Sequence, residues 1–427
     1  MKKIVSLLLA LALVLCSVGA VFAEAAAEPV KMTFWTFQDL HINLYQAMLD
    51  KWNADPTKTP LEIDFQPYPF EDMHTMLNMA IDAGEGLPDI VDIEIGKFAN
   101  YLGENIVLAP MNDYVEPIAD HLVMARLNNY AKDGKYYGID HHIGATVMFY
   151  NAKLLEDAGI DYTTIATWDD FHEAGKVFLE KTGKPMITFE TTDCWSLYPM
   201  VNQHGGDWLT ADNQVRMDET VVVDTMKFMQ SMLEDGTAIP TPGGMSHTEE
   251  YYGWMDQGGC AAICMPFWYL DRFVNFMPDL NGCMKIAPMP TWADGGHKSA
   301  QMGGTGTAVI ASSANVELAK EFVAYVGLTS EGCITTWKTC GYDPILKDVY
   351  GTPEMQETNK FFEYYGQDLF AVLQTVLDDI PDTCLTAYYP AATDIVKSQM
   401  AYRLIELRED PETIAKECAE ELRGQIE

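Results

Sequence analysis

Basic residues are scarce in this 427-residue sequence. Lysine and arginine together number 27 against 63 aspartates and glutamates, so the formal net charge is -36 at pH 7. Only six of those basic residues are arginines. A surface with such an excess of negative charge repels nucleic acid and anionic lipid headgroups. We therefore expect neither as a partner, and the charge favours solubility outside the cell.

Motifs that carry catalysis or phosphate binding are also missing. The sequence contains no G-x-S-x-G and no H-E-x-x-H, and the glycine-rich "GGTGTA" (303–308) lacks the lysine of a phosphate-binding loop. Acid pairs such as Asp92 with Glu94, or Asp378 with Asp379, have the composition of a glycosidase acid and nucleophile. In a chain with 63 acids, such pairs more often form solvated faces. We expect a protein that is not an enzyme and that needs no cofactor.

Cysteines are present, but their spacing is not that of a metal site. The nine cysteines include no C-x-x-C pair, and Cys260 with Cys264 has no second close pair with histidine to complete a zinc site. We therefore expect no metal. Cys333 and Cys340 would close a short loop and are the leading candidates for a disulfide, with buried free thiols as the alternative.

The one long apolar run lies at the start of the sequence. Residues 1–23 combine two lysines, an apolar stretch and small residues near Ala23, which is the pattern of a cleaved signal peptide. Cys16 could carry a lipid, but the bulky Leu15 stands where a small residue would be wanted, so lipidation is the weaker interpretation. We expect an exported chain in the periplasm or on the outer face of the cytoplasmic membrane. Loss of the two lysines would leave a net charge of -38 (-36 minus 2).

Strands and helices alternate along the rest of the chain, in the manner of an α/β fold. "VKMTFWTF" (30–37) predicts a strand, "HINLYQAMLDKWNAD" (41–55) an amphipathic helix, and "LEIDFQPYP" (61–69) a second strand. Another helix and strand follow over 70–95, and the alternation resumes beyond residue 151. Such a repeat predicts parallel strands with helices on both faces. About 400 mature residues exceed the size of one core, so two lobes are expected.

The segment "GKYYGIDHHIGATVMFYN" (134–151) is polar and rich in small residues in its first part and becomes an apolar strand in its second part. No flexible linker interrupts the chain, so two lobes would have to be joined by structured segments. Gly144 and Ala145 are small enough to let the backbone turn where a larger side chain would collide. A crossing between lobes and an ordinary strand with a bulge fit this composition equally well.

A family resemblance favours the crossing. "DGKYYGIDHHIGATVMFYNAKLLEDAGID…TWDDFHEAGKVF" resembles a segment of the extracellular solute-binding proteins of family 1, the sugar-binding components of bacterial ATP-binding-cassette importers. Further matches follow in family order over residues 30–425: "TFW", "GEGLPDIVDIE", "MDQGGCAAICMPFW", "GGTGTAVIASSANVELAKEFVAYV" and "GYDPILKDV". The chain departs from the family at Asp140 and His141, where a proline is usual, and at Gly144 and Ala145, where some relatives carry a polar residue.

The resemblance implies a two-lobed periplasmic-binding-protein-like fold of type II, in which each lobe is a sheet flanked by helices. The ligand cleft would lie at the hinge and close on a carbohydrate, which a monomeric receptor would deliver to a membrane permease. The crossings would fall near residues 142–145, 302–305 and 342–346. The lobes would comprise 30–143 with 305–345, and 144–304 with the C-terminal helices of 346–427.

Candidate ligand-binding residues come from loops and from the carboxyl ends of strands, where ligands bind in open α/β sheets. Sugars have apolar faces and a ring of hydroxyls, so their sites combine aromatic platforms with hydrogen-bonding side chains. The expected platforms are Trp35, Phe37, Trp195, Trp268 and Tyr342, with Trp268 the strongest single candidate and Tyr388, beside Tyr389, as a further wall. The expected polar partners are Gln38, Asp39, Asp92, Glu94, His142 and Asp193, and Gly303 and Gly304 are expected at a crossing beside the ligand.

Other ligand classes remain open at this point. A polyamine or another cation would suit an acidic cleft, which Asp39, Asp92, Glu94 and Asp193 could form. An amino acid or peptide would need an arginine for its carboxylate, and Arg272 could supply it. A neutral mono- or oligosaccharide is the first expectation and a cationic solute the second.

Overall fold

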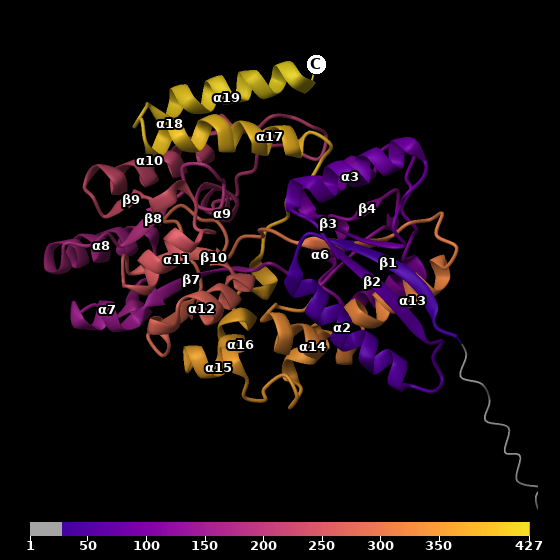
Figure 1. The fold of residues 1–427 in the computed structure, drawn as a ribbon. Helices are drawn as coiled ribbons and strands as arrows, with labels where there is room; N and C mark the ends of the chain where they lie inside the picture. Colours follow the sequence, from indigo (N-terminus) through magenta and orange to yellow (C-terminus); the bar gives the residue numbers. More distant parts are fainter. Residues whose placement is uncertain (1–27, 427) are drawn as a thin grey trace, which may run out of the picture.

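The computed structural model describes residues 28–426 and shows two halves joined by chain segments that pass between them (Figure 1). The expected signal peptide, its cleavage near Ala23 and the possible lipid site Cys16 lie outside the described residues. Within residues 28–426, no helix combines the length and the apolar character that a membrane crossing requires.

A five-stranded sheet forms the centre of the first half, which we call the first lobe. The strand order is β2-β1-β3-β12-β6. β1 is parallel to β2 and β3, as the alternation of strands and helices predicted, whereas β12 is antiparallel to β3 and β6. The strands are β1 (Val30–Thr36), β2 (Leu61–Pro67), β3 (Ile90–Glu94), β6 (Ile139–Asp140) and β12 (Thr305–Val309).

Helices pack on both faces of this sheet. Successive side chains of a strand point to opposite faces. Phe34 accordingly shares a buried cluster with Leu44 of α2, and its neighbour Trp35 shares another with Met73 of α3. The helices and the small hairpin of this lobe are α2 (Asp39–Ala54), α3 (Phe70–Ala83), α4 (Ile95–Phe98), α5 (Asn112–Val115), α6 (Met124–Asn128), β4 (Ala131–Lys132), β5 (Lys135–Tyr136), α13 (Val316–Leu328) and α14 (Ser330–Cys340).

The second lobe is built on a three-stranded antiparallel sheet with the order β10-β7-β11. Every residue of the central strand β7 is buried, because helices and loops cover both of its faces. A separate parallel pair, β8 with β9, lies beside it. The strands are β7 (Thr146–Asn151), β8 (Ile187–Phe189), β9 (Ala238–Pro240), β10 (Ala262–Pro266) and β11 (Met284–Ala287).

The helices of the second lobe begin and end at the signals present in the sequence. Thr167 caps α8 in a reciprocal pair of hydrogen bonds with Asp170, and the helix ends at Gly183 with φ of 69°. The helices are α7 (Ala152–Asp157), α8 (Trp168–Thr182), α9 (Leu197–Gln203), α10 (Thr220–Glu234), α11 (Glu249–Asp256) and α12 (Leu270–Phe276).

The C-terminal helices also belong to this side of the molecule. α15 and α16 contact β11, and α18 and α19 contact α10 (Figure 1). A π-helical turn, Val396–Met400, joins α17 to α18. The helices are α15 (Lys360–Tyr365), α16 (Leu369–Gln374), α17 (Tyr389–Ile395), α18 (Ala401–Ile405) and α19 (Pro411–Ile426).

Three chain segments lie side by side between the two sheets. The backbone N–H of Ile143 donates to the carbonyl of Asp343 at 2.8 Å, and that of Met302 donates to the carbonyl of Gly144 at 3.2 Å. Gly144 has φ of 73°, and a Cβ atom there would lie 2.8 Å from the Met302 carbonyl oxygen. The small residue at position 144 is therefore required by both the backbone conformation and the neighbouring segment.

The cysteines remain separate thiols. All eight cysteines between residues 28 and 426 are free, which contradicts the expected pairing of Cys333 with Cys340. Both lie on α14. A separation of seven residues along a helix amounts to roughly 10 Å, beyond the Cα distance of about 7 Å that a disulfide tolerates.

Candidate functional site

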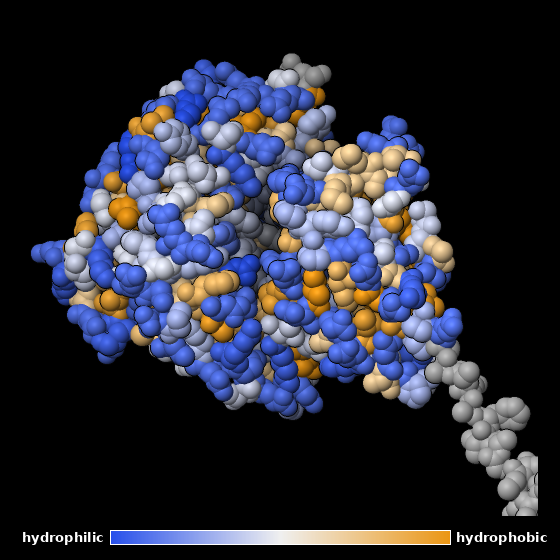
Figure 2. All heavy atoms as spheres, in the orientation of Figure 1, coloured by the Kyte–Doolittle hydropathy of each residue, from blue (hydrophilic) through white to orange (hydrophobic). Residues whose placement is uncertain are grey.

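A cavity of about 610 Å³ lies between the two sheets. Figure 2 shows the surface hollowed between the two halves. First-lobe residues after β1 and at the end of β3 line one side, and loops of the second lobe line the other. α17 of the second lobe contacts α4 of the first, and Leu385 packs against buried clusters of both lobes. The volume falls in the range of sites for small organic ligands.

The crossing segments form the floor of this cavity, and a buried arginine ties them together. Arg126 pairs with Asp140, with Nε 2.7 Å from Oδ2, and its Nη1 donates to Gln301 Oε1 at 3.0 Å. It also donates to the carbonyl of Gly303. A Cβ atom on Gly304 would lie 1.7 Å from Arg126 Nη2, so only glycine leaves room for the guanidinium. Burial favours protonation of Asp140, but the Arg126 charge, the neighbouring histidines and the hydrogen bond from Tyr130 together lower the pKa of Asp140.

His142 lines the same floor as an uncharged ring. Its side chain is almost fully buried and lies 4.8 Å from the ring of Tyr342, centroid to centroid. Burial lowers the pKa of His142 to about 3, with the Asp140 charge acting in the opposite direction. Its Nδ1 atom is buried without a hydrogen-bond partner among residues 28–426. At neutral pH, His142 is therefore an uncharged ring whose Nδ1 keeps an unused hydrogen-bonding capacity.

Three aromatic rings form one side of the cavity, and we call Trp195, His247 and Trp268 the aromatic wall. The rings of His247 and Trp268 are stacked with centroids 5.5 Å apart, and Trp195 meets Trp268 edge-on at 5.2 Å. Trp268 Nε1 donates to the carbonyl of Met302 at 3.2 Å, which links the wall to a crossing segment. Trp268 is 8% exposed, whereas Trp195 is half-buried. Trp195 therefore presents more of its ring to the cavity.

Charged side chains along the cavity are balanced in sign and mostly paired. Four are acidic and four basic: Glu71, Glu94, Asp193 and Asp394, with Lys97, Arg126, Arg272 and Lys397. Each basic group has an ion-pair partner, such as Asp193 for Lys397 at 3.2 Å and Asp271 for Arg272 at 3.2 Å. Burial raises the pKa of Glu94 to about 7, against the opposing charge of Lys397. The cavity thus lacks the excess negative charge of the chain as a whole.

Most of the residues predicted for the site do meet at this cavity. They come from both lobes and from the crossing segments, which lie far apart in the sequence. The predicted residues that line the cavity are Phe37, Gln38, Glu94, His142, Asp193, Trp195, Trp268, Gly303, Gly304 and Tyr342.

Four predicted residues lie outside the cavity. Trp35 points to the α3 face of the sheet, where its Nε1 donates to Gln66 Oε1 at 2.9 Å. Asp39 lies exposed in the first turn of α2. Tyr388 does not line the cavity, which is lined instead by the adjacent Tyr389 at the start of α17.

Asp92, the fourth, is a structural group beneath the sheet end. Its carboxylate accepts hydrogen bonds from Thr36 at 2.7 Å, from Thr307 at 2.5 Å and from His41 Nδ1 at 2.8 Å. His41, Asp92 and His141 have potential metal-ligand atoms within 4.8 Å of one another. Asp92 is held by these three donors, and His141 Nε2 lies 2.9 Å from the Thr307 hydroxyl, so the cluster links the first crossing to β3 and β12.

Several lining residues were not predicted from the sequence. Arg126, His247, Gln301 and Lys397 lie in loops or helices outside the strand-end rule that guided the prediction. His247 follows a short turn and precedes Thr248, the cap of α11. No local pattern in "GGMSHTEE" signals a ligand, so only the tertiary structure could reveal these positions.

Comparisons with known proteins agree with the geometry. A family model described as bacterial extracellular solute-binding protein matches residues 39–330. A protein of Bacillus subtilis (strain 168), named arabinooligosaccharide-binding protein, is 39% identical over 399 residues, which covers 93% of this chain and 92% of that protein. A protein of the same name from Halalkalibacterium halodurans is 41% identical over 372 residues, covering 87% of this chain and 83% of that protein.

The fold is likewise found among solved structures. The GacH receptor of Streptomyces glaucescens superimposes with a TM-score of 0.76 at 20% sequence identity, covering 92% of this chain and 97% of that one. Likeness at this level of identity concerns the fold alone. The two-lobed α/β architecture that the sequence predicted is confirmed.

Proposed function

The chain belongs to the bacterial extracellular solute-binding proteins, and we therefore propose that it captures a carbohydrate for an ATP-binding-cassette importer. The receptor works outside the cytoplasmic membrane as a monomer, closes its two lobes on the ligand and delivers it to a membrane permease. It acts as a binding protein and not as an enzyme, in keeping with the names of its curated relatives.

The lining of the cavity carries the carbohydrate part of this proposal. Aromatic rings and uncharged hydrogen-bonding groups surround one space, which is the combination that a hydroxyl-rich ring with apolar faces requires. Trp195 offers a half-exposed ring, and Gln38 offers an amide that both donates and accepts. Gln301, whose Oε1 already accepts from Arg126, offers its amide N–H groups. This combination of aromatic rings, uncharged hydrogen-bonding groups and balanced charges is the observation on which the function rests.

An arabino-oligosaccharide is the first candidate ligand. Two relatives at about 40% identity over most of this chain carry that specificity in their names. A cavity of about 610 Å³ also has room for more than one sugar ring. We propose a short arabino-oligosaccharide in preference to a monosaccharide.

A polyamine, the runner-up from the sequence, has weaker support. Of the four carboxyls expected to attract a cation, Asp39 and Asp92 lie outside the cavity, and Asp193 is paired with Lys397. Glu94 has a raised pKa of about 7, which leaves it only partly charged. Four basic groups on the cavity lining would further oppose a polycation.

Closure is proposed to occur at the three crossing segments. Under this proposal one lobe comprises 30–143 with 305–345, and the other comprises 144–304 with the C-terminal residues from 346. The hinge would lie at 142–145, 302–305 and 342–346, which are joined by backbone hydrogen bonds. The first two ranges contain glycines at positive φ, and the third directly follows Gly341, which also has positive φ.

A ligand screen tests the function directly. The mature chain is titrated with arabinotriose, maltotriose and spermidine while its melting temperature and the composition of the solution are followed. We expect arabinotriose to raise the melting temperature in a concentration-dependent manner without being consumed. Stabilisation by spermidine alone would favour the polyamine receptor, and hydrolysis of arabinotriose would establish an enzyme.

A further inference from the structure

His247 occupies an unusual environment in the aromatic wall. Its ring stacks on Trp268 and meets Trp195 at a centroid distance of 5.5 Å. The side chain is half-buried and lines the cavity. The Nε2 atom is shielded from solvent, and no group of residues 28–426 makes a hydrogen bond to it. The residue as a whole is only half-buried, so a ligand in the cavity would contact the part of the imidazole that reaches the lining and not the shielded Nε2.

The backbone on both sides of His247 is held in place by neighbouring side chains. Glu190 Oε1 accepts from the backbone N–H of Ser246 at 2.6 Å, and the Tyr269 hydroxyl donates to the Ser246 carbonyl at 2.6 Å. Thr248 accepts from the backbone N–H of Tyr251 at 3.2 Å and so caps α11 immediately after His247. His247 is thus preorganised, as expected of a residue whose position matters for binding.

The ring is uncharged at physiological pH. Burial lowers the pKa of His247 to about 3, and the nearby Arg272 charge acts in the same direction. A neutral imidazole has one nitrogen that donates and one that accepts, which suits a hydroxyl. A neutral ring does not attract an anionic or cationic ligand by charge.

From this geometry we infer that His247 is a ligand-binding residue that forms a hydrogen bond to a hydroxyl of a sugar ring seated against Trp195. The inference rests on the proposed function and deepens it, because it assigns one polar contact within the carbohydrate site.

Isothermal titration with arabinotriose tests the assignment. His247→Phe keeps a ring that can stack on Trp268 but removes both nitrogens, and we expect affinity to fall by about 10-fold to 100-fold because the sugar hydroxyl loses its partner. His247→Asn places an amide near the Nδ1 position and His247→Gln near the Nε2 position. We expect one of these two variants to bind more tightly than His247→Phe.

Controls separate a failure of this inference from a failure of the function. His172→Phe alters a histidine of α8 that pairs with Asp235 at 2.7 Å away from the cavity, and it should bind as the unmodified chain does. The ¹⁵N signals of the His247 ring should shift on addition of arabinotriose, and those of His172 should not.

If the unmodified chain binds arabinotriose and His247→Phe binds it equally well, the inference is wrong. If neither amide variant improves on His247→Phe, the ring acts by packing alone and the inference is again wrong. If the unmodified chain binds no carbohydrate, the proposed function itself fails.

Discussion

Trp268 is held in place by three neighbouring side chains and by one hydrogen bond to the backbone. His247 stacks on it, Trp195 meets it edge-on, and the Arg272 guanidinium lies 6.0 Å from its ring. Its Nε1 is bonded to the Met302 carbonyl. With only 8% of the residue exposed, Trp268 contributes to the shape of the cavity as much as to its surface.

The two tryptophans of the aromatic wall should therefore respond differently to removal. We expect Trp268→Ala to lower the free energy of unfolding by about 3–5 kcal/mol, because it leaves a void and an unpaired carbonyl. Trp195→Ala should cost much less stability and still weaken binding of arabinotriose. Urea unfolding and calorimetric titration of both variants check this. A Trp268→Ala protein as stable as the unmodified chain would contradict it.

Asp343 is a second residue whose behaviour follows from burial. It is fully buried in the third crossing segment, where Oδ2 accepts from the backbone N–H of Ala145 at 3.0 Å. Burial raises the pKa of Asp343 to about 7, although this N–H group, that of Gly144 and the Arg126 charge oppose the shift. The folded state therefore binds a proton that the unfolded chain would release near 3.8.

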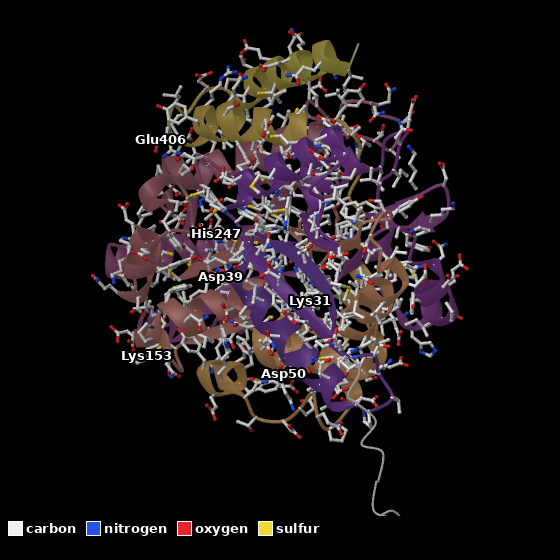
Figure 3. All side chains as sticks on the ribbon, turned by 45° about the vertical axis from the view of Figure 1, so that its right-hand side comes forward. Lys31, Asp39, Asp50, Lys153, His247 and Glu406 are labelled. Atoms are coloured by element: carbon white, nitrogen blue, oxygen red, sulfur yellow. The ribbon has the colours of Figure 1, made fainter. Side chains whose placement is uncertain are left out.

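The stabilising effect of that proton is complete below the unfolded pKa and is lost as the pH rises through about 7. We expect Asp343 to contribute up to about 4 kcal/mol to the fall in unfolding free energy between acidic and neutral pH. Asp343→Asn keeps an acceptor for Ala145 and should make the pH dependence shallower. Urea unfolding across this range measures the slope. Asp50→Asn, on the exposed face of α2 (Figure 3), should leave the slope unchanged.

At the scale of elements, the positions of helices and strands were predictable from the sequence, whereas the pairing of the strands was less so. Helices α2, α3 and α8 follow from apolar spacing, and α3 and α8 end at glycines in the left-handed conformation. The antiparallel entry of β12 into the first sheet was not foreseen. Strand direction depends on where the chain returns from, and a local pattern does not contain that information.

Gly144 in the first crossing segment and Gly134 in the turn between β4 and β5 form a matched pair of glycines. Gly144 and Gly134 both have φ of 73°, but only Gly144 has close neighbours, with the Met302 carbonyl 2.8 Å from the position of a Cβ atom. We expect Gly134→Ala to cost about 1–2 kcal/mol through its backbone conformation alone. Gly144→Ala should cost more and should also weaken ligand binding. Unfolding and titration of both variants test this, and equal losses of stability would show that the crossings are not tightly fitted.

At the scale of the whole molecule, the two lobes meet around the cavity and are linked by three crossing segments (Figure 1). His247, labelled in Figure 3, lines the cavity from the second lobe, and Phe37 lines it from the first. Residues from both lobes therefore have to come together for the proposed ligand to be enclosed.

If closure encloses the ligand, the overall size of the molecule in solution should depend on it. We expect small-angle X-ray scattering to give a smaller radius of gyration in the presence of saturating arabinotriose than in its absence. Spermidine at the same concentration serves as the control and should produce no change. Scattering curves that stay identical while calorimetry reports arabinotriose binding would show that binding occurs without closure.

The sequence by itself determined the alternation of strands and helices, the two-lobed architecture and ten of the residues that line the cavity. These follow from local patterns and from motifs in a recognisable order, because apolar spacing and turn residues act over short stretches of chain. The identity of Trp268, Tyr342 and His142 as residues near the cleft belongs to this group.

Only the tertiary structure decided which side of each element faces the cavity. Trp35 and Phe37 lie two residues apart on and after β1, yet Trp35 packs against α3 while Phe37 lines the cavity. Asp92 satisfies three donors inside the first lobe, and His247 reaches the cavity from a loop with no signal of its own. Such roles depend on side chains brought together from distant parts of the chain, and long-range packing creates these neighbours.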